Sequence, residues 1–227
     1  ARAVPGKGSK PASLTPAAFM LIRRLHRLLI SPHPRPARRQ ALVWFGLSLG
    51  VAATYGLLEL LQAFSGTYVV QDDARQHVFW MRRFVDQGLL ANDLIADYFQ
   101  SLAPVGYSAF YWLMAQLGVD PLLVSKLVPP VLALIATAYG FGISMRLFPV
   151  PVAGFLTTLL LNRVLWKAVA VLSGTPRAFA YPVFFAFLFY VLRGSLAPCL
   201  ITIALQALFY PPLVLLSLGL LFLRLLT

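Results

Sequence analysis

Long apolar runs dominate this 227-residue chain and limit what it can fold into. Hydrophobic residues make up 59% of the sequence and charged residues 11%, too little charge to cover the surface of a soluble domain. A helix of about 20 apolar residues crosses ~30 Å of hydrocarbon. Runs of roughly this kind lie at 41–63, 102–118, 122–147, 150–172, 178–194 and 196–226, the second being short. We therefore expect an all-α, polytopic transmembrane helical bundle of about six spans.

The last apolar run contains Pro211-Pro212. Two consecutive prolines remove two backbone donors, which predicts either two half-spans or a strong kink. The sequence stops at Thr227 without a polar tail, so we expect the chain to be part of a longer protein. Cys199 lies in an apolar stretch, where a small buried hydrophobe is the expected role.

The net charge of +12 is unevenly distributed along the chain. Nine of the nineteen Lys and Arg residues precede residue 40, immediately before the first predicted span. By the positive-inside rule this places the N-terminus in the cytoplasm and the 64–101 loop outside, with a bacterial inner membrane as the expected location. Six alternating spans would then put Arg163, Lys167 and Arg177 inside and the 148–149 turn and Arg193 outside. This distribution requires no nucleic acid partner.

The chain divides into a basic cytoplasmic segment, 1–40, and a transmembrane module, 41–227. Residues 1–14 are rich in Gly, Pro, Ser and Lys, which predicts disorder. Thr15-Pro16 then predicts the start of an amphipathic helix, with apolar residues at helical spacing and arginines off that stripe. We expect this helix to lie in the headgroup layer of the bilayer. Docking to a partner protein is the alternative.

Six of the seven acidic residues fall between Asp72 and Asp120, in an otherwise apolar chain. From Asp72 onward the loop predicts a short amphipathic helix capped by Asp72 or Asp73 and ended near Gly88. A second short helix is predicted over 92–100, with Asn92 or Asp93 as its cap. The 64–101 loop should therefore form surface helices along the outer membrane face.

The adjacent carboxylates of Asp72 and Asp73 have three candidate roles. They can supply oxygen ligands to a divalent cation such as Mg²⁺ or Mn²⁺, act as a general base, or only cap a helix. His77 follows Asp73 by four residues, on the same helical face, and Arg75 is close enough in sequence to hold an anion. These neighbours favour a site at Asp72, Asp73 and His77 over capping alone.

At this point the order of segments resembles a known family. The pattern Asp72-Asp73-Ala74-Arg75-Gln76-His77, then Gly88, then Pro104-Val105-Gly106-Tyr107 before the next apolar run, is similar to the N-terminal module of the GT-C glycosyltransferases. That superfamily includes oligosaccharyltransferases and protein O-mannosyltransferases. The resemblance covers roughly residues 41–195 and implies a sugar donor carried on a polyprenyl phosphate. It also implies an essential Asp in the first external loop that activates the acceptor or helps to bind a metal.

Two registers of this resemblance are open. Asp72 matches the first acid of the family's acidic pair, while Asp73 with His77 matches the Asp-x-x-x-His form. Candidate ligands for the donor phosphate are four arginines, whose planar guanidinium matches phosphate oxygens: Arg75, Arg82, Arg83 and Arg146. Headgroup contact or pairing with Asp86 is the alternative for these arginines. Glu59, the only acid within a predicted span, either reaches the interface or faces the Asp72 site.

The chain also departs from the family, whose members usually have nine or more spans. No acid follows Asp120, so a further carboxylate ligand would come from Asp86, Asp93 or Asp97, or from a longer chain. A second hypothesis is therefore a non-catalytic integral membrane subunit of a larger membrane complex. A transporter is a third, given the proline-broken final run, although polar residues do not recur at mid-membrane.

Overall fold

The computed structural model describes residues 20, 38–66, 69–167 and 171–226, and every regular element in these ranges is helical. In chain order the elements are α2 (Arg38–Ala63), α3 (Asp72–His77), the 3₁₀ helix η1 (Phe79–Phe84), α4 (Leu94–Leu102), α5 (Val105–Gln116), α6 (Pro121–Leu147), α7 (Pro151–Lys167), α8 (Pro176–Arg193), α9 (Leu196–Phe209) and α10 (Pro212–Leu226). The predicted disorder of 1–14 and the interfacial helix from Thr15 lie outside the described residues, apart from Met20.

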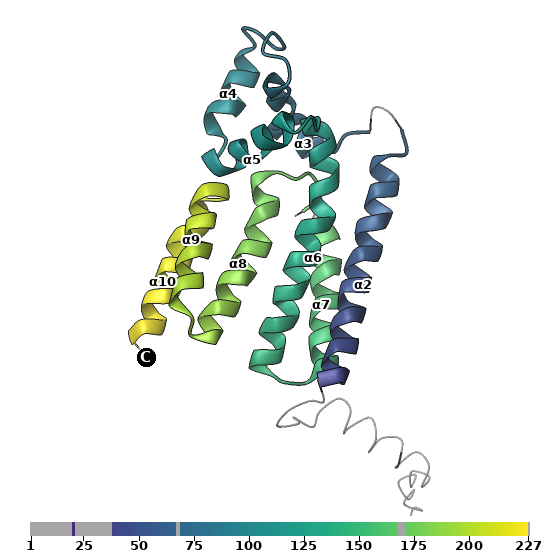
Figure 1. Cartoon of the computed structure of the whole chain (residues 1–227), viewed down its shortest axis with the longest axis vertical. Coiled ribbons are helices and arrows are strands. Elements are labelled where there is room, and N and C mark those ends of the chain that lie inside the picture. Colours follow the sequence, from purple (N-terminus) through teal and green to yellow (C-terminus); the bar gives the residue numbers. More distant parts are fainter. Residues whose placement is uncertain (1–19, 21–37, 67–68, 168–170, 227) are drawn as a thin grey trace, which may run out of the picture.

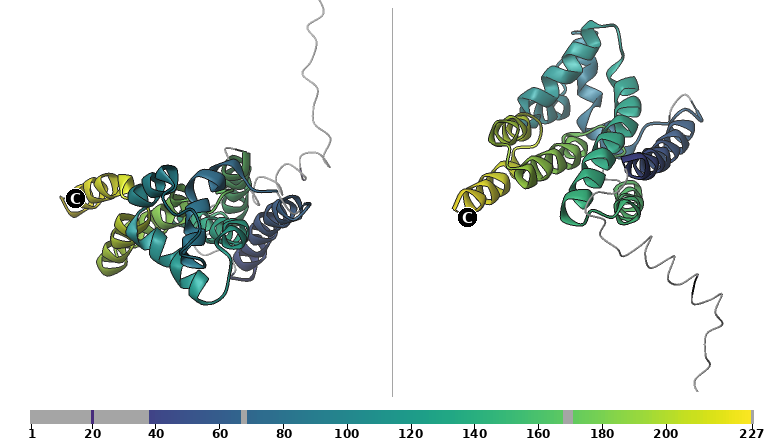
Figure 2. Two further views of the ribbon diagram at one scale, coloured as in Figure 1. Left: turned by 90° about the horizontal axis from the view of Figure 1, so that it is seen from above. Right: turned by 60° about the horizontal axis from the view of Figure 1, so that its bottom comes forward.

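The helices form an axial bundle with a cap at one end. Figure 1 shows α2, α6, α7, α8, α9 and α10 running along the long axis, while α3, η1, α4 and α5 gather at one end. We call residues 69–120 the cap. Seen along the bundle, α2, α6 and α7 form one group and α8, α9 and α10 the other, and α6 packs on α8 where the groups meet (Figure 2).

Two helices in the described part of the chain, α2 and α6, are long and apolar enough to cross a bilayer. They have 26 and 27 residues, which at 1.5 Å per residue gives ~40 Å each. Helix α6 is continuous through Pro129-Pro130. The other axial helices have 14 to 18 residues. The all-helical class is thus confirmed, and two helices have the length and composition of a membrane span.

Small residues let α2 approach its neighbours closely, as is usual for helices packed in membranes. Ser48, Ala52 and Gly56 recur every four residues on its buried face. A Cβ added at Gly56 would lie 2.8 Å from Cβ of Pro130 in α6. Thr158 of α7 donates a hydrogen bond from Oγ1 to Oγ of Ser48 at 2.8 Å. The α2–α6–α7 group is therefore held by close backbone packing and by a buried polar contact.

The predicted span at 102–118 is wrong. Its place is taken by α5, a helix of 12 residues and ~18 Å that lies in the cap (Figure 1). Pro104 precedes its first residue, and Gly118 follows its end with a φ of 81°. Because α5 does not run along the bundle, α6, α7, α8 and α9 run in the opposite direction to the one predicted.

The reversed direction changes the end at which each basic residue lies. The 148–150 turn and Arg193 lie at the same end as the start of α2, whereas Lys167 and Arg177 lie at the cap end. Both assignments are the opposite of the prediction. The break at Pro211-Pro212 is confirmed, since α9 and α10 form an antiparallel hairpin. Ser217 Oγ donates a hydrogen bond to Gln206 Oε1 across it at 2.7 Å.

Candidate functional site

The acidic pair lies in the first turn of α3, and neither residue caps the helix. The N-cap is Gln71, in extended conformation, and it makes no side-chain capping bond. Asp72 is exposed and Asp73 half-buried. Within the described ranges neither carboxylate accepts a hydrogen bond or joins an ion pair. Both therefore remain available to a ligand, at the positive end of a short helix.

His77 and Arg75 do not close around this pair. The His77 ring packs edge-on against Phe99 of α4, with ring centres 5.3 Å apart. Arg75 donates from Nε to the Val70 carbonyl at 3.2 Å. In the described part of the chain, no three His, Cys, Asp or Glu side chains gather to hold a metal ion. Asp72 and Asp73 could thus supply at most two ligands to a divalent cation.

The guanidinium of Arg83 is engaged in hydrogen bonds within the cap. Its Nη1 donates to Asp97 Oδ1 at 2.7 Å and to Gln100 Oε1 at 2.8 Å, and its Nη2 donates to the Leu90 carbonyl at 2.5 Å. The side chain is only 17% exposed. These contacts join η1 to α4 and to the loop before it, so they leave Arg83 little capacity for a phosphate.

Arg82 is better placed to bind an anion. Its Nε lies 3.4 Å from Asp120 Oδ2, and the two side chains are 50% and 41% exposed. An exposed pair of this kind contributes about 0–1 kcal/mol, so Arg82 can exchange Asp120 for another anion at little cost. Asp86, the other proposed partner of these arginines, instead accepts a hydrogen bond from its neighbour Gly88 N at 2.9 Å.

Arg146 lies far from the other candidates. It is in the last turn of α6, stacked on the Phe189 ring at 5.3 Å, whereas Asp120 caps the first turn of the same helix. The 26 residues between them correspond to ~39 Å of continuous helix. Arg146 therefore lies too far from Arg82 and its partner Asp120 to share one phosphate with Arg82.

A polar junction beneath α3 includes Lys126, a residue that the sequence analysis above did not select. Gln71 Nε2 donates to Glu59 Oε1 at 2.5 Å, so the acid of α2 faces the start of α3. Lys126 of α6 donates from Nζ to the Ala63 carbonyl at 2.7 Å and lies 5.0 Å from the Phe64 ring centre. Glu59 and Lys126 line one small cavity of 10 Å³, about the space of one water. A lone Lys in an apolar run was the signal in the sequence.

Two buried tyrosines of α5 form the floor of the cap. The rings of Tyr107 and Tyr111 lie 5.0 Å apart, and Tyr111 donates a hydrogen bond to the Gly174 carbonyl at 2.8 Å. Burial raises the pKa of both hydroxyls above the ordinary value, so both stay protonated. The 171–175 loop is thus bonded to the cap. The predicted alternation of spans had placed this part of the chain, between Lys167 and Arg177, at the end where α2 begins.

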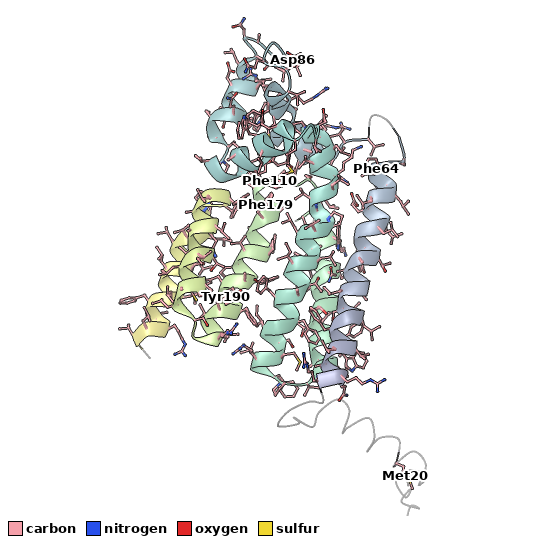
Figure 3. The ribbon with its side chains drawn as sticks, viewed as in Figure 1. Met20, Phe64, Asp86, Phe110, Phe179 and Tyr190 are labelled. Carbon is pink, nitrogen blue, oxygen red and sulfur yellow. The ribbon has the colours of Figure 1, made fainter. Side chains whose placement is uncertain are left out.

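Below the cap, an apolar cavity of 870 Å³ runs along the bundle. Helix α8 forms its back wall, α6 and α9 form its sides, and α5 forms its roof. The α8 wall is hollow because Pro182, Val183 and Ala186 are small, whereas Phe179 and Tyr190 stand at its two ends. Figure 3 shows Phe110 of the cap next to Phe179 of α8, with Tyr190 toward the opposite end.

Charged residues adjoin the cap end of this cavity. Val119 lines it and is followed by Asp120, the partner of Arg82. Phe179 lines it two residues after Arg177, which is exposed in the first turn of α8. The arrangement can hold a molecule with a long apolar part and an anionic end. Comparisons with protein-family models, with curated proteins and with solved structures find no match to this chain.

Proposed function

We propose that this protein is a membrane glycosyltransferase-like protein that uses a sugar donor carried on a polyprenyl phosphate. The observation that carries the proposal is the 870 Å³ apolar cavity directly beneath a cap that bears two unpaired carboxylates. The cavity would take the prenyl chain, and the sugar phosphate would lie at the cap. Arg82, which pairs with Asp120 next to Val119, and Arg177, two residues before Phe179, are basic residues close to lining residues at the end of the cavity where the phosphate would be.

The proposal places the bundle across a membrane, with α2 and α6 as full spans. The remaining axial helices are shorter than the hydrocarbon, α9 reaching ~21 Å, so the bilayer would thin locally around them. Large apolar side chains face outward from α2 and α10, including Leu57 at 58% and Leu215 at 81% exposure. Such surfaces suit contact with lipid or with other membrane helices.

The charges favour a cytoplasmic N-terminus and an external cap. Nine Lys and Arg precede residue 40, and Arg146, Arg193 and Arg224 lie at the bundle end where α2 begins. The other seven basic residues and all seven acidic residues lie toward the cap. The side richer in Lys and Arg is the cytoplasmic one under the positive-inside rule. A bacterial inner membrane, with the cap in the periplasm, agrees with this arrangement.

The proposed reaction needs a base, a leaving group and a cation for the leaving group. A carboxylate of Asp72 or Asp73 takes the proton of the acceptor as the acceptor's oxygen or nitrogen bonds to the anomeric carbon. The bond from that carbon to the phosphate oxygen breaks, and polyprenyl phosphate leaves with its charge near Arg82. A divalent cation held by Asp72 and Asp73 would supply further charge neutralisation of the phosphate.

Substitution of the two carboxylates tests this proposal. We expect Asp72→Asn or Asp73→Asn to lower transfer from a radiolabelled polyprenyl-phosphate hexose by about 10²–10⁴-fold in proteoliposomes. Asp86→Asn is the matched control, because Asp86 lies in the same cap and bonds only to its own turn. Transfer at the wild-type rate by both Asn variants would refute the enzymatic role.

A non-catalytic membrane subunit is the second candidate. It is favoured by His77, whose ring contacts Phe99 and leaves the acidic pair without a third ligand, and by the exposed leucines of α10. Under this hypothesis α10 would pack against another membrane protein. Normal glycan formation by the Asn variants, together with co-purification of a membrane complex that Leu215→Ser disrupts, would favour it.

A further inference from the structure

The two ends of the apolar cavity have different chemistry. Basic side chains flank both ends, Arg82 and Arg177 on the cap side and Arg146 at the other end, where two hydroxyls also meet. Tyr139 of α6 and Tyr190 of α8 both line the cavity, and their hydroxyl oxygens lie 3.3 Å apart. Their rings are 5.9 Å apart, and Phe189 packs against both. The pair joins α6 to α8 across that end of the cavity.

The position of this pair fixes the length of the cavity. Along α6, the lining residues run from Val124 to Tyr139, which corresponds to ~22 Å of helix. Along α8 they run from Phe179 to Tyr190, ~16 Å. Half of the ~30 Å hydrocarbon core is ~15 Å. A chain that enters from the cap end therefore runs ~16–22 Å before it reaches the tyrosines, which is more than half of that core.

We infer that the Tyr139–Tyr190 pair is a wall that sets how many carbon atoms of a lipid phosphate's chain the protein holds. The inference rests on the proposed function, which supplies the occupant, a prenyl chain with its phosphate at the cap. The proposed function also sets the direction of entry, because it places the phosphate at the cap; among the described residues, basic side chains flank both ends of the cavity and no acidic residue lines it. The pair is a specificity determinant and takes no part in the reaction.

The physical basis is the pair of rings, which pack against Phe189 and against each other across the end of the cavity. A chain that pushed past the pair would have to separate the two rings from each other and from Phe189, which loses their packing contacts. A chain that stops short of the pair leaves part of the cavity without contacts. The tightest fit is therefore a chain segment that ends against the two rings.

A length series of prenyl phosphates tests the inference. Unlabelled prenyl phosphates of two to seven isoprene units, and one of eleven, would displace a fluorescent prenyl phosphate from the purified full chain. For the wild type, affinity should rise with length and then level off. Tyr190→Ala should move the plateau to a longer chain, with each newly held unit adding roughly threefold or more. Tyr190→Phe, which keeps the ring, should leave the plateau within one unit of the wild type.

Three further results make the test decisive. Tyr139→Ala opens the same wall from α6 and should move the plateau in the same direction. Ala186→Phe fills the hollow of α8 and should weaken every chain, whereas Ala207→Phe, exposed on α9 outside the cavity, should not. An unchanged length profile in both alanine variants would overturn the inference alone. A wild-type protein that binds no prenyl phosphate would overturn the lipid donor of the proposed function as well.

Discussion

Gly174 provides the strongest single test of how the cap is joined to the bundle. Its φ is +57°, and a Cβ placed there would lie 2.8 Å from the Tyr111 hydroxyl oxygen, 3.1 Å from Ser125 Cα and 3.2 Å from the Ser125 carbonyl oxygen. Two of these three atoms belong to the backbone of α6, which cannot move without moving the helix. The Tyr111 hydroxyl can move, but it then loses its bond to the Gly174 carbonyl.

The expected cost of Gly174→Ala has two parts. A left-handed conformation costs a residue with a Cβ about 1–2 kcal/mol. Loss of a buried hydrogen bond that leaves its partner unsatisfied costs about 1–3 kcal/mol. We therefore expect the free energy of unfolding to fall by about 2–5 kcal/mol. SDS-titrated unfolding in mixed micelles, followed by circular dichroism, measures this difference.

Gly118→Ala is the matched control for the steric part. Gly118 has a φ of +81° and nothing within 4 Å of its ideal Cβ, so only the backbone term applies, about 1–2 kcal/mol. A double variant with Tyr111→Phe checks the mechanism, because both substitutions remove the same bond and their effects should add to less than the sum. If Gly174→Ala proves no more harmful than Gly118→Ala, the proposed packing of this loop on α5 and α6 is refuted.

Two further predictions concern α5. Gly106→Ala would bring a Cβ to 2.6 Å from Leu208 Cβ and 2.9 Å from its carbonyl oxygen, so we expect a loss of about 1–3 kcal/mol in the same unfolding assay. Gly219→Ala, with open space around it, should be neutral or stabilising. The second prediction follows from burial, which raises the pKa of Tyr107 and Tyr111 in the folded state, so the unfolded chain releases these protons first. Stability should be complete below about pH 10 and fall above it, by up to about 1.4 kcal/mol per pH unit for each tyrosine. A pH series of unfolding curves in which Tyr111→Phe has the wild-type slope would contradict this.

Apolar run length predicted the axial helices well where the run was long and uninterrupted. The runs at 41–63 and 122–147 correspond to Arg38–Ala63 and Pro121–Leu147, and the break at Pro211-Pro212 follows from proline chemistry. The run at 102–118 was wrongly predicted to be a membrane span. Hydropathy shows that a helix avoids water, but it does not show whether lipid or protein covers the helix. Helix α5 is apolar because it forms the roof of the cavity and packs on α9.

The cavity could not be predicted, because its walls come from four helices distant in sequence. Its hollow depends on which face of α8 meets α6 and α9, and the low hydropathic contrast between the faces of α8 gives no sign of that face. Only the small residues Pro182 and Ala186, at a spacing of four, hint at a recess. Their place in the sequence does not distinguish a recess from close helix packing.

The start of α3 shows why local sequence rules misplaced the acidic pair. Asp is a favoured N-cap, so Asp72 or Asp73 was expected to accept a hydrogen bond from the first turn. Instead the helix begins one residue earlier, since Gln71 takes the extended cap conformation and its side chain bonds to Glu59 of α2. A contact between residues twelve positions apart thus decides the register of a six-residue helix, which has few local interactions of its own. The result is that both carboxylates lie on the first turn with no bond to its backbone, which is the property that a base or a metal ligand requires.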